Sequence, residues 1–153
     1  MRIELLCDVD GHDRDQEISG GAVLVLRPYG TAEVVALGEL VGTVRGAHLH
    51  GSLHGINHPH ARGDGVFLPD IHGVLRTAAG IPMRCTFRGR TVFDDSRGDA
   101  MMGVTFAAED AAYRWLNNAV CVYEGIVNPR PHERISVCSN ELAGGAAPED
   151  SAA

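Results

Sequence analysis

The stretch from Val66 to Phe93, VFLPDIHGVLRTAAGIPMRCTFRGRTVF, has the pattern of two β-strands joined by a turn. Residues of one parity are mostly apolar and those of the other are polar or ionisable, which is the period of a strand with two different faces. The apolar set is Phe67, Ile71, Leu75, Ile81, Met83, Cys85 and Phe87. The polar set is Asp70, His72, Arg76, Arg84, Thr86 and Arg88. The pattern therefore predicts a hairpin with one apolar and one ionisable face.

The turn at residues 78–80, Ala-Ala-Gly, sets the register of this hairpin. The two faces stay separate only if paired residues share parity, and a three-residue loop that ends in glycine meets this condition. The resulting register pairs Thr77 with Ile81, Leu75 with Met83, His72 with Thr86 and Asp70 with Arg88. An Asp70–Arg88 pair beside His72 is either a solvated cross-strand ion pair or part of a polar lining inside a barrel.

The length and charge of the chain narrow the classes of protein it can belong to. A chain of 153 residues is expected to form one domain with a core of its own. A net charge of -7 without a run of basic residues argues against nucleic acid or an anionic membrane as a partner. No apolar run approaches the roughly 20 residues of a membrane span, and the start turns acidic where a signal peptide is apolar. We therefore expect a cytoplasmic protein, with its four cysteines reduced and buried.

Five of the eight histidines lie between residues 46 and 65, in GAHLHGSLHGINHPHARGDG. The many glycines predict an irregular loop, which is often a functional lid in a compact domain. One interpretation is a pH-sensitive loop over a cavity or an interface, with no cofactor. The alternative is a divalent transition metal, because histidines at these spacings converge on one side of a strand or a helix. Its ligands would be His48, His50, His54, His58 and His60.

The rest of the chain alternates between β-rich runs and turn signals. The best helix candidate lies near residues 108–117, where Glu109 and Asp110 occupy a favourable first turn. Residues 143–153 have the composition of a disordered tail. We predict an all-β fold: a single antiparallel β-barrel of about eight strands over residues 1–142, with one short helix.

Two segments resemble a known bacterial family. LPDIHGVLRTAAGIPMRCTFRGRT resembles its Asp-bearing strand, glycine turn and returning strand, and FAAEDAAYRWLNNAVCVYEGIV resembles its tryptophan-leucine-asparagine signature. The family is the domain of unknown function thirty-two thirty-seven, and the matching positions are Asp70, Trp115, Leu116 and Asn117. His72 stands where relatives often carry a bulky basic residue, and the histidine-rich segment departs from the pattern. The resemblance implies a small barrel similar to allene oxide cyclase and calycin-like barrels, whose lumen holds an apolar small molecule.

The function we predict is that of a cofactor-independent enzyme for a hydrophobic, polyketide-like or terpenoid-like intermediate. His72 or Asp70 would act as general acid or base, and Arg88 or Arg84 would stabilise an enolate or a carboxylate. Cyclisation, isomerisation and elimination reactions such as dehydration all fit this chemistry. The predicted catalytic residues are Asp70, His72 and Arg88. The predicted substrate-binding residues are Arg84, Met101, Trp115, Asn117 and Tyr123.

Two alternatives stay open: a metal-dependent lyase or hydrolase that uses the histidine cluster, and a non-catalytic small-molecule binding protein. The face of the hairpin that points inward distinguishes catalysis from binding. Asp70, His72 and Arg88 inside the barrel would favour chemistry, because burying unneeded charge is costly. Ile71, Leu75 and Phe87 inside would favour binding. By analogy with other barrels, we expect a homodimer or a trimer.

Overall fold

The computed structural model describes residues 2–13, 24–28, 30, 33–94, 97–127 and 134–141. The long strands are β1 (Arg2–Asp13), β3 (Val34–Arg45), β4 (Gly51–Asn57), β7 (Asp70–Thr77), β8 (Pro82–Phe93), β9 (Gly98–Ala107), β10 (Val120–Val127) and β11 (Arg134–Glu141). Three short strands are β2 (Leu24–Leu26), β5 (His60–Ala61) and β6 (Val66–Leu68). A 3₁₀ helix, η1, spans Arg114–Asn118. The tail predicted at residues 143–153 lies outside the described residues.

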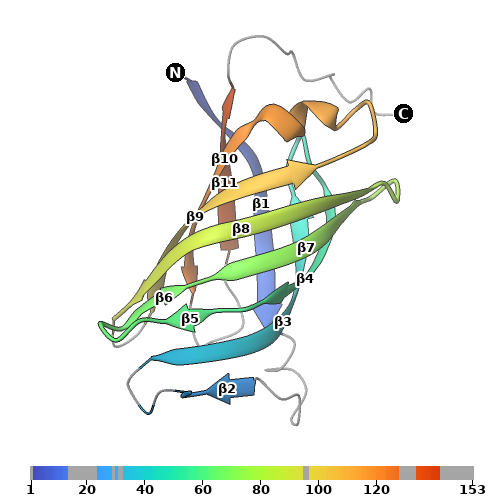
Figure 1. Ribbon diagram of the computed structural model, residues 1–153. Helices are drawn as coiled ribbons and strands as arrows, with labels where there is room; N and C mark the ends of the chain where they lie inside the picture. Colours follow the sequence, from blue (N-terminus) through green and yellow to red (C-terminus); the bar gives the residue numbers. More distant parts are fainter. Residues whose placement is uncertain are drawn as a thin grey trace.

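The long strands form a ring of antiparallel pairs (Figure 1). Starting at β1, each strand pairs with the next in the order β1, β11, β10, β9, β8, β7, β4 and β3, and β3 pairs with β1 again. Closure removes the unpaired edges that an open sheet would leave. The predicted antiparallel barrel of about eight strands is therefore confirmed.

Side chains alternate between the inside and the outside of the barrel. Along β9, residues at even positions are buried and those at odd positions are exposed. The same alternation in β8 buries Met83, Cys85 and Phe87 and leaves Arg84 and Arg88 outside. Burial of this apolar set is the main favourable contribution to folding.

The predicted register of the β7–β8 hairpin is confirmed. Asp70 pairs with Arg88 and His72 with Thr86. The turn is closed by the Thr77 N–H, which donates to the Ile81 carbonyl at 2.9 Å. Gly80 has φ +85°, a conformation that L side chains rarely adopt, which explains glycine at the last loop position.

The prediction of an irregular loop at residues 46–65 was wrong, because this segment contains β4 and β5. Glycine there reflects close strand packing: a Cβ on Gly51 would lie 2.1 Å from the carbonyl oxygen of Arg76 in β7. Leu53 and Gly55 are buried, and Ser52, His54 and Ile56 are exposed, as in any two-faced strand.

A short helix is present where one was predicted, but it is a 3₁₀ helix and it starts later. The Asp110 side chain accepts the Ala112 N–H at 2.9 Å, and the Asp110 carbonyl accepts the Tyr113 N–H at 3.1 Å. These bonds form a turn that competes with a helical first turn. The helix lies at the end of the barrel opposite β2 (Figure 1). Within the described ranges, no helix has the length and apolarity that crossing a membrane requires.

Candidate functional site

The inner wall of the barrel carries no charged side chain among the described residues of β3, β4, β7, β8, β9 and β10. Cross-strand pairs share a face, so the buried members of each strand identify the inward positions. The hairpin presents its apolar set, including Ile71, Leu75 and Phe87, to the inside. The open question of which face points inward is therefore answered in favour of the apolar one.

The wall is less tightly packed along β3 than along the strands across from it. The inward positions of its first ten residues are only half-buried, namely Val34, Ala36, Gly38, Leu40 and Gly42. The inward positions of β9, by contrast, are all buried. An eight-stranded barrel has an interior just wide enough to be filled by side chains or to hold one small ligand. Solvent therefore reaches the inward face of β3, where three of these five positions are alanine or glycine.

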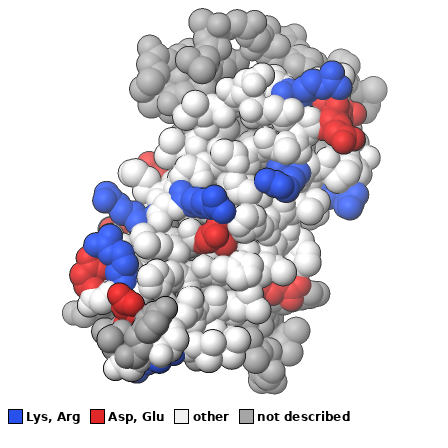
Figure 2. All heavy atoms as spheres, viewed as in Figure 1, with Lys and Arg blue, Asp and Glu red and all other residues white. Residues whose placement is uncertain are grey.

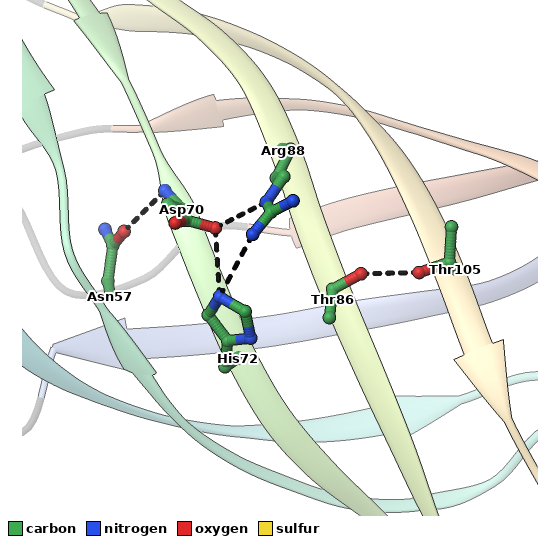
Figure 3. Close-up of polar contacts among 6 residues, drawn as sticks. All are labelled: Asn57, Asp70, His72, Thr86, Arg88 and Thr105. Carbon is green, nitrogen blue, oxygen red and sulfur yellow. Dashed lines mark hydrogen bonds and ion pairs between the residues drawn. The ribbon is translucent and has the colours of Figure 1, made fainter.

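Asp70, His72 and Arg88 come together as a cluster, as the hairpin register predicts, and the cluster lies on the outer surface. The Arg88 Nε donates to Asp70 Oδ1 at 2.7 Å, and His72 Nε2 lies 3.1 Å from the same oxygen (Figure 3). Arg88 Nη2 is 3.5 Å from His72 Nε2. Because Asp70 accepts and Arg88 only donates, Nε2 bonds to Asp70 when it carries a proton and to Arg88 when it does not. The side chains of Arg88 and Asp70 are 66% and 40% exposed.

Two neighbours hold this cluster in place. Asn57, in β4, accepts the Asp70 backbone N–H at 3.2 Å (Figure 3). His58 donates its backbone N–H to the Asp70 carbonyl at 3.0 Å, and its ring meets that of His72 edge-on with centroids 6.4 Å apart. The hairpin pattern gave no signal for these two residues, because their approach depends on the β4–β7 pairing.

The electrostatics of the cluster do not favour Asp70 as a proton acceptor. The hydrogen bond from Arg88, together with the nearby positive charge, holds the pKa of Asp70 below its ordinary value. A lower pKa makes the carboxylate a weaker base. The predicted catalytic role of Asp70, His72 and Arg88 stays a prediction, now placed on the outer wall.

Replacing Arg88 with glutamine is expected to raise the pKa of Asp70 toward its ordinary value of about 3.9. In the wild type the pair stabilises the fold above the unfolded-state pKa, and this contribution is lost as the pH falls through the lowered native pKa. Below about pH 4 the variant should therefore lose less free energy of unfolding than the wild type. The difference should be under about 1 kcal/mol, because the pair is exposed. NMR titration of the Asp70 carboxyl carbon measures this, and an unchanged pKa would contradict the assignment.

Arg84, predicted to bind substrate, lies on the outer wall beside an open cleft with a volume of about 690 Å³. The cleft lies between the β7–β8 turn and the segment that follows β9. Its apolar lining is formed by Val74, Ala79, Gly80, Ile81, Pro82, Met83 and Ala107. The rest of the cleft lining consists of three charged residues, Arg84, Glu109 and Asp110. One cation and two carboxylates therefore border the same space.

The other predicted substrate-binding residues are dispersed. Met101 is 50% exposed on the outer face of β9. Trp115 packs against the core from η1. Tyr123 is buried on the inner wall, where its ring meets that of Phe87 edge-on at 5.9 Å. Among the predicted substrate-binding residues named here, Tyr123 is the one that lies on the inner wall.

Asn117 joins the helix to the end of β9. Its Oδ1 accepts the Ala108 N–H at 2.7 Å, and its Nδ2 donates to the Ala108 carbonyl at 2.9 Å. Both polar atoms of the amide are therefore used on backbone groups that the end of the strand would otherwise leave unpaired.

The five histidines proposed as metal ligands do not converge. His54 faces outward on β4 and contacts Glu39, His58 adjoins His72, and His60 lies on β5. In the part of the chain that the structure describes, no group of three or more His, Cys, Asp or Glu side chains is placed to hold a metal ion. The metal alternative therefore has no preformed centre among these residues.

Three of the four cysteines, Cys7, Cys85 and Cys121, are free and buried, as expected, and the side chain of Cys138 is not among those that the structure describes. Burial raises the pKa of Cys7 and Cys85 to about 12 and that of Cys121 to about 11. These thiols are therefore protonated at neutral pH and are poor nucleophiles. They act as small apolar wall residues.

Comparison with known proteins identifies the class of fold. No protein-family model and no curated protein sequence matches the chain. Among solved structures, a protein of unknown function from Clostridium acetobutylicum ATCC 824 matches with a TM-score of 0.78 at 15% identity, covering 92% of this chain and all of that one. A β-barrel-like protein from Acinetobacter baumannii AYE gives 0.73 at 16% identity, over 91% and 96% of the two chains. An enzyme from Penicillium herquei gives 0.69 at 19% identity, over 92% and 94%.

These identities are low, so the matches show the fold alone. The chain is a small β-barrel protein whose architecture recurs over nearly the full length of each of these structures.

Proposed function

We propose that the chain binds a neutral, hydrophobic small molecule inside the barrel. The observation that carries this proposal is the inner wall: it lacks charged side chains at the described positions, and it remains half-buried along β3. An ionised ligand would lose its hydration there without gaining a charged partner, so the wall selects against it. The polyketide-like and terpenoid-like compounds of the original prediction are suitable candidates in their uncharged forms.

We also infer membership of family thirty-two thirty-seven. The support is the match at Asp70, Trp115, Leu116 and Asn117 together with the barrel architecture. The similar solved structures share the barrel fold and carry no family assignment.

Binding can be tested with the neutral fluorophore N-phenyl-1-naphthylamine. The wild type is expected to bind it and to bind the anionic 1-anilinonaphthalene-8-sulfonate much more weakly. Replacing Ala36 with tryptophan fills the half-buried side of the lumen, and it should weaken binding of the neutral probe at least tenfold, or by about 1.4 kcal/mol.

The matched control is Val35→Trp, one position away and facing outward, where the side chain is 40% exposed. This variant should bind the probe like the wild type. Circular dichroism verifies that both variants are folded. Equal binding by the two variants would place the probe outside the lumen, for example in the cleft beside Arg84, and would contradict the proposal.

Catalysis is the second candidate. It is supported by the assembly of Asp70, His72 and Arg88 within 3.5 Å of one another and by the fold shared with an enzyme. In this case the substrate would bind against the outer wall at the cluster, where it would be cyclised, isomerised or dehydrated without a cofactor.

Replacing His72 with alanine separates the two candidates. A hydrophobic compound retained by the wild type would be incubated with each protein and analysed by mass spectrometry. If the cluster is catalytic, the wild type yields product and the variant does not, while both give the same circular dichroism spectrum because His72 lies outside the core. Recovery of unchanged compound from the wild type would leave binding as the function.

A further inference from the structure

We propose that two copies of this chain associate through the outer surface of the central hairpin. The surface, called the hairpin face below, is formed by outward side chains of four adjacent strands, β4, β7, β8 and β9. Its residues are Ile56, Asp70, His72, Val74, Arg84, Thr86, Arg88, Gly103 and Thr105.

The hairpin face combines exposed apolar side chains with three charged ones, Asp70, Arg84 and Arg88. Ile56 and Val74 are 45% and 44% exposed, and the hydroxyls of Thr86 and Thr105 are already hydrogen-bonded to each other. Figure 2 shows this side of the molecule: basic and acidic side chains lie next to each other in its middle, and further charged residues lie along its left and right margins. Interfaces are enriched in arginine and depleted in aspartate, so the fit of this surface to a partner depends on how Asp70 is paired.

The charges that the hairpin face does carry are arranged so that they fit a second copy. Consider a two-fold axis that lies above the hairpin face, midway between β7 and β8 and parallel to both strands. Rotation about this axis places β7 of the second copy over β8 of the first. Each residue then lies opposite the residue with which it pairs across the two strands of its own hairpin. Asp70 then faces Arg88 of the second copy, and Arg88 faces Asp70.

The same rotation sets His72 against Thr86 and Val74 against Arg84. No two arginines of β8 therefore oppose each other, although Arg84, Arg88 and Arg90 all point outward from that strand. Such a contact is isologous, with the same patch used by both copies. A strongly anionic partner would instead meet Asp70 in the middle of the surface, which is why a second copy fits better.

Gly103 offers a direct test because it has room for a side chain within one chain. A Cβ there would meet a single atom within 4 Å, the Arg88 carbonyl oxygen at 3.9 Å. Gly103→Arg therefore leaves the barrel intact and adds bulk and charge to the hairpin face. Light scattering should give the wild type a mass of twice 16.3 kDa and the variant the mass of one chain.

The control is Gly63→Arg, in an exposed turn where a Cβ would meet nothing within 4 Å. This variant should keep the dimer mass. A monomeric or trimeric wild type, or a Gly103→Arg variant that still forms dimers, would overturn the proposal.

A charge exchange tests the position of the axis. Asp70→Arg and Arg88→Asp are each expected to be monomeric, because each brings like charges face to face. An equimolar mixture should recover the dimer mass, since every Arg in one variant then meets an Asp in the other. Both side chains are exposed, so both variants should fold, which circular dichroism verifies. A mixture that stays monomeric would overturn this arrangement.

Discussion

Replacing Gly89 with alanine is expected to destabilise the barrel by about 3 kcal/mol or more, the upper end of what overpacking usually costs. Gly89 faces inward on β8 opposite Met102 of β9. A Cβ there would lie 2.1 Å from the Met101 carbonyl oxygen and 2.6 Å from the Met102 Cα. These are backbone atoms of a paired strand, so they can move away only by breaking the ladder. Thermal unfolding should show a loss of roughly 6–12 °C for a domain of this length.

The control for this variant lies on the neighbouring strand. Gly103→Ala adds the same methyl group at an outward position with open space around it, and its effect should stay within about 0.5 kcal/mol. A Gly89→Ala protein as stable as Gly103→Ala would show that β8 and β9 are not packed as closely at this point as described.

The hairpin illustrates what a local pattern determines. Its parity, its three-residue loop and the pairing of Asp70 with Arg88 all depend on neighbours within one hairpin, and all are confirmed. The direction in which each face points depends instead on the closure of the ring. Closure depends on all eight strands. The sequence of one hairpin therefore left two alternatives for the Asp70–Arg88 pair, a polar lining inside the barrel and a solvated ion pair outside it.

The segment at residues 46–65 shows where composition misleads. Glycine weakens an isolated strand, so a glycine-rich segment is typical of a loop. Here glycine permits close approach between strands, as at Gly51. The histidines then fall on different strands and faces, because β4 ends at Asn57 and Pro59 separates it from β5. A cluster in sequence is therefore not a cluster in space.

The candidate site also has one part that depends on local pairing and one part that depends on the pairing of distant strands. The outer cluster of Asp70, His72 and Arg88 follows from the hairpin register. The uncharged inner wall required the pairing of distant strands, since the half-buried β3 positions lie on a strand whose β1 partner comes from the start of the chain. The signal in the sequence was the set of alternate positions in VVALGELVGTV, residues 34–44, because the positions that point inward carry only glycine and uncharged apolar residues.

The end of the barrel near η1 gives the second large prediction. Leu116 is fully buried and is the helix residue that enters the core. Leu116→Ala should destabilise the protein by about 2–5 kcal/mol, because the methyl groups are lost and a cavity is left behind. The two hydrogen bonds between Asn117 and Ala108 keep the helix in place and so prevent it from collapsing into the space, which favours the upper part of that range.

Urea unfolding of Leu116→Ala and of Leu37→Ala separates core packing from the general effect of truncating a leucine. Leu37 is 40% exposed on the outer face of β3, so its replacement should cost under about 1 kcal/mol. If the two variants lose equal stability, Leu116 does not close the barrel and η1 is an appendage of the β9–β10 connection. If Leu116→Ala loses several times more, η1 is an integral part of the core at this end of the barrel.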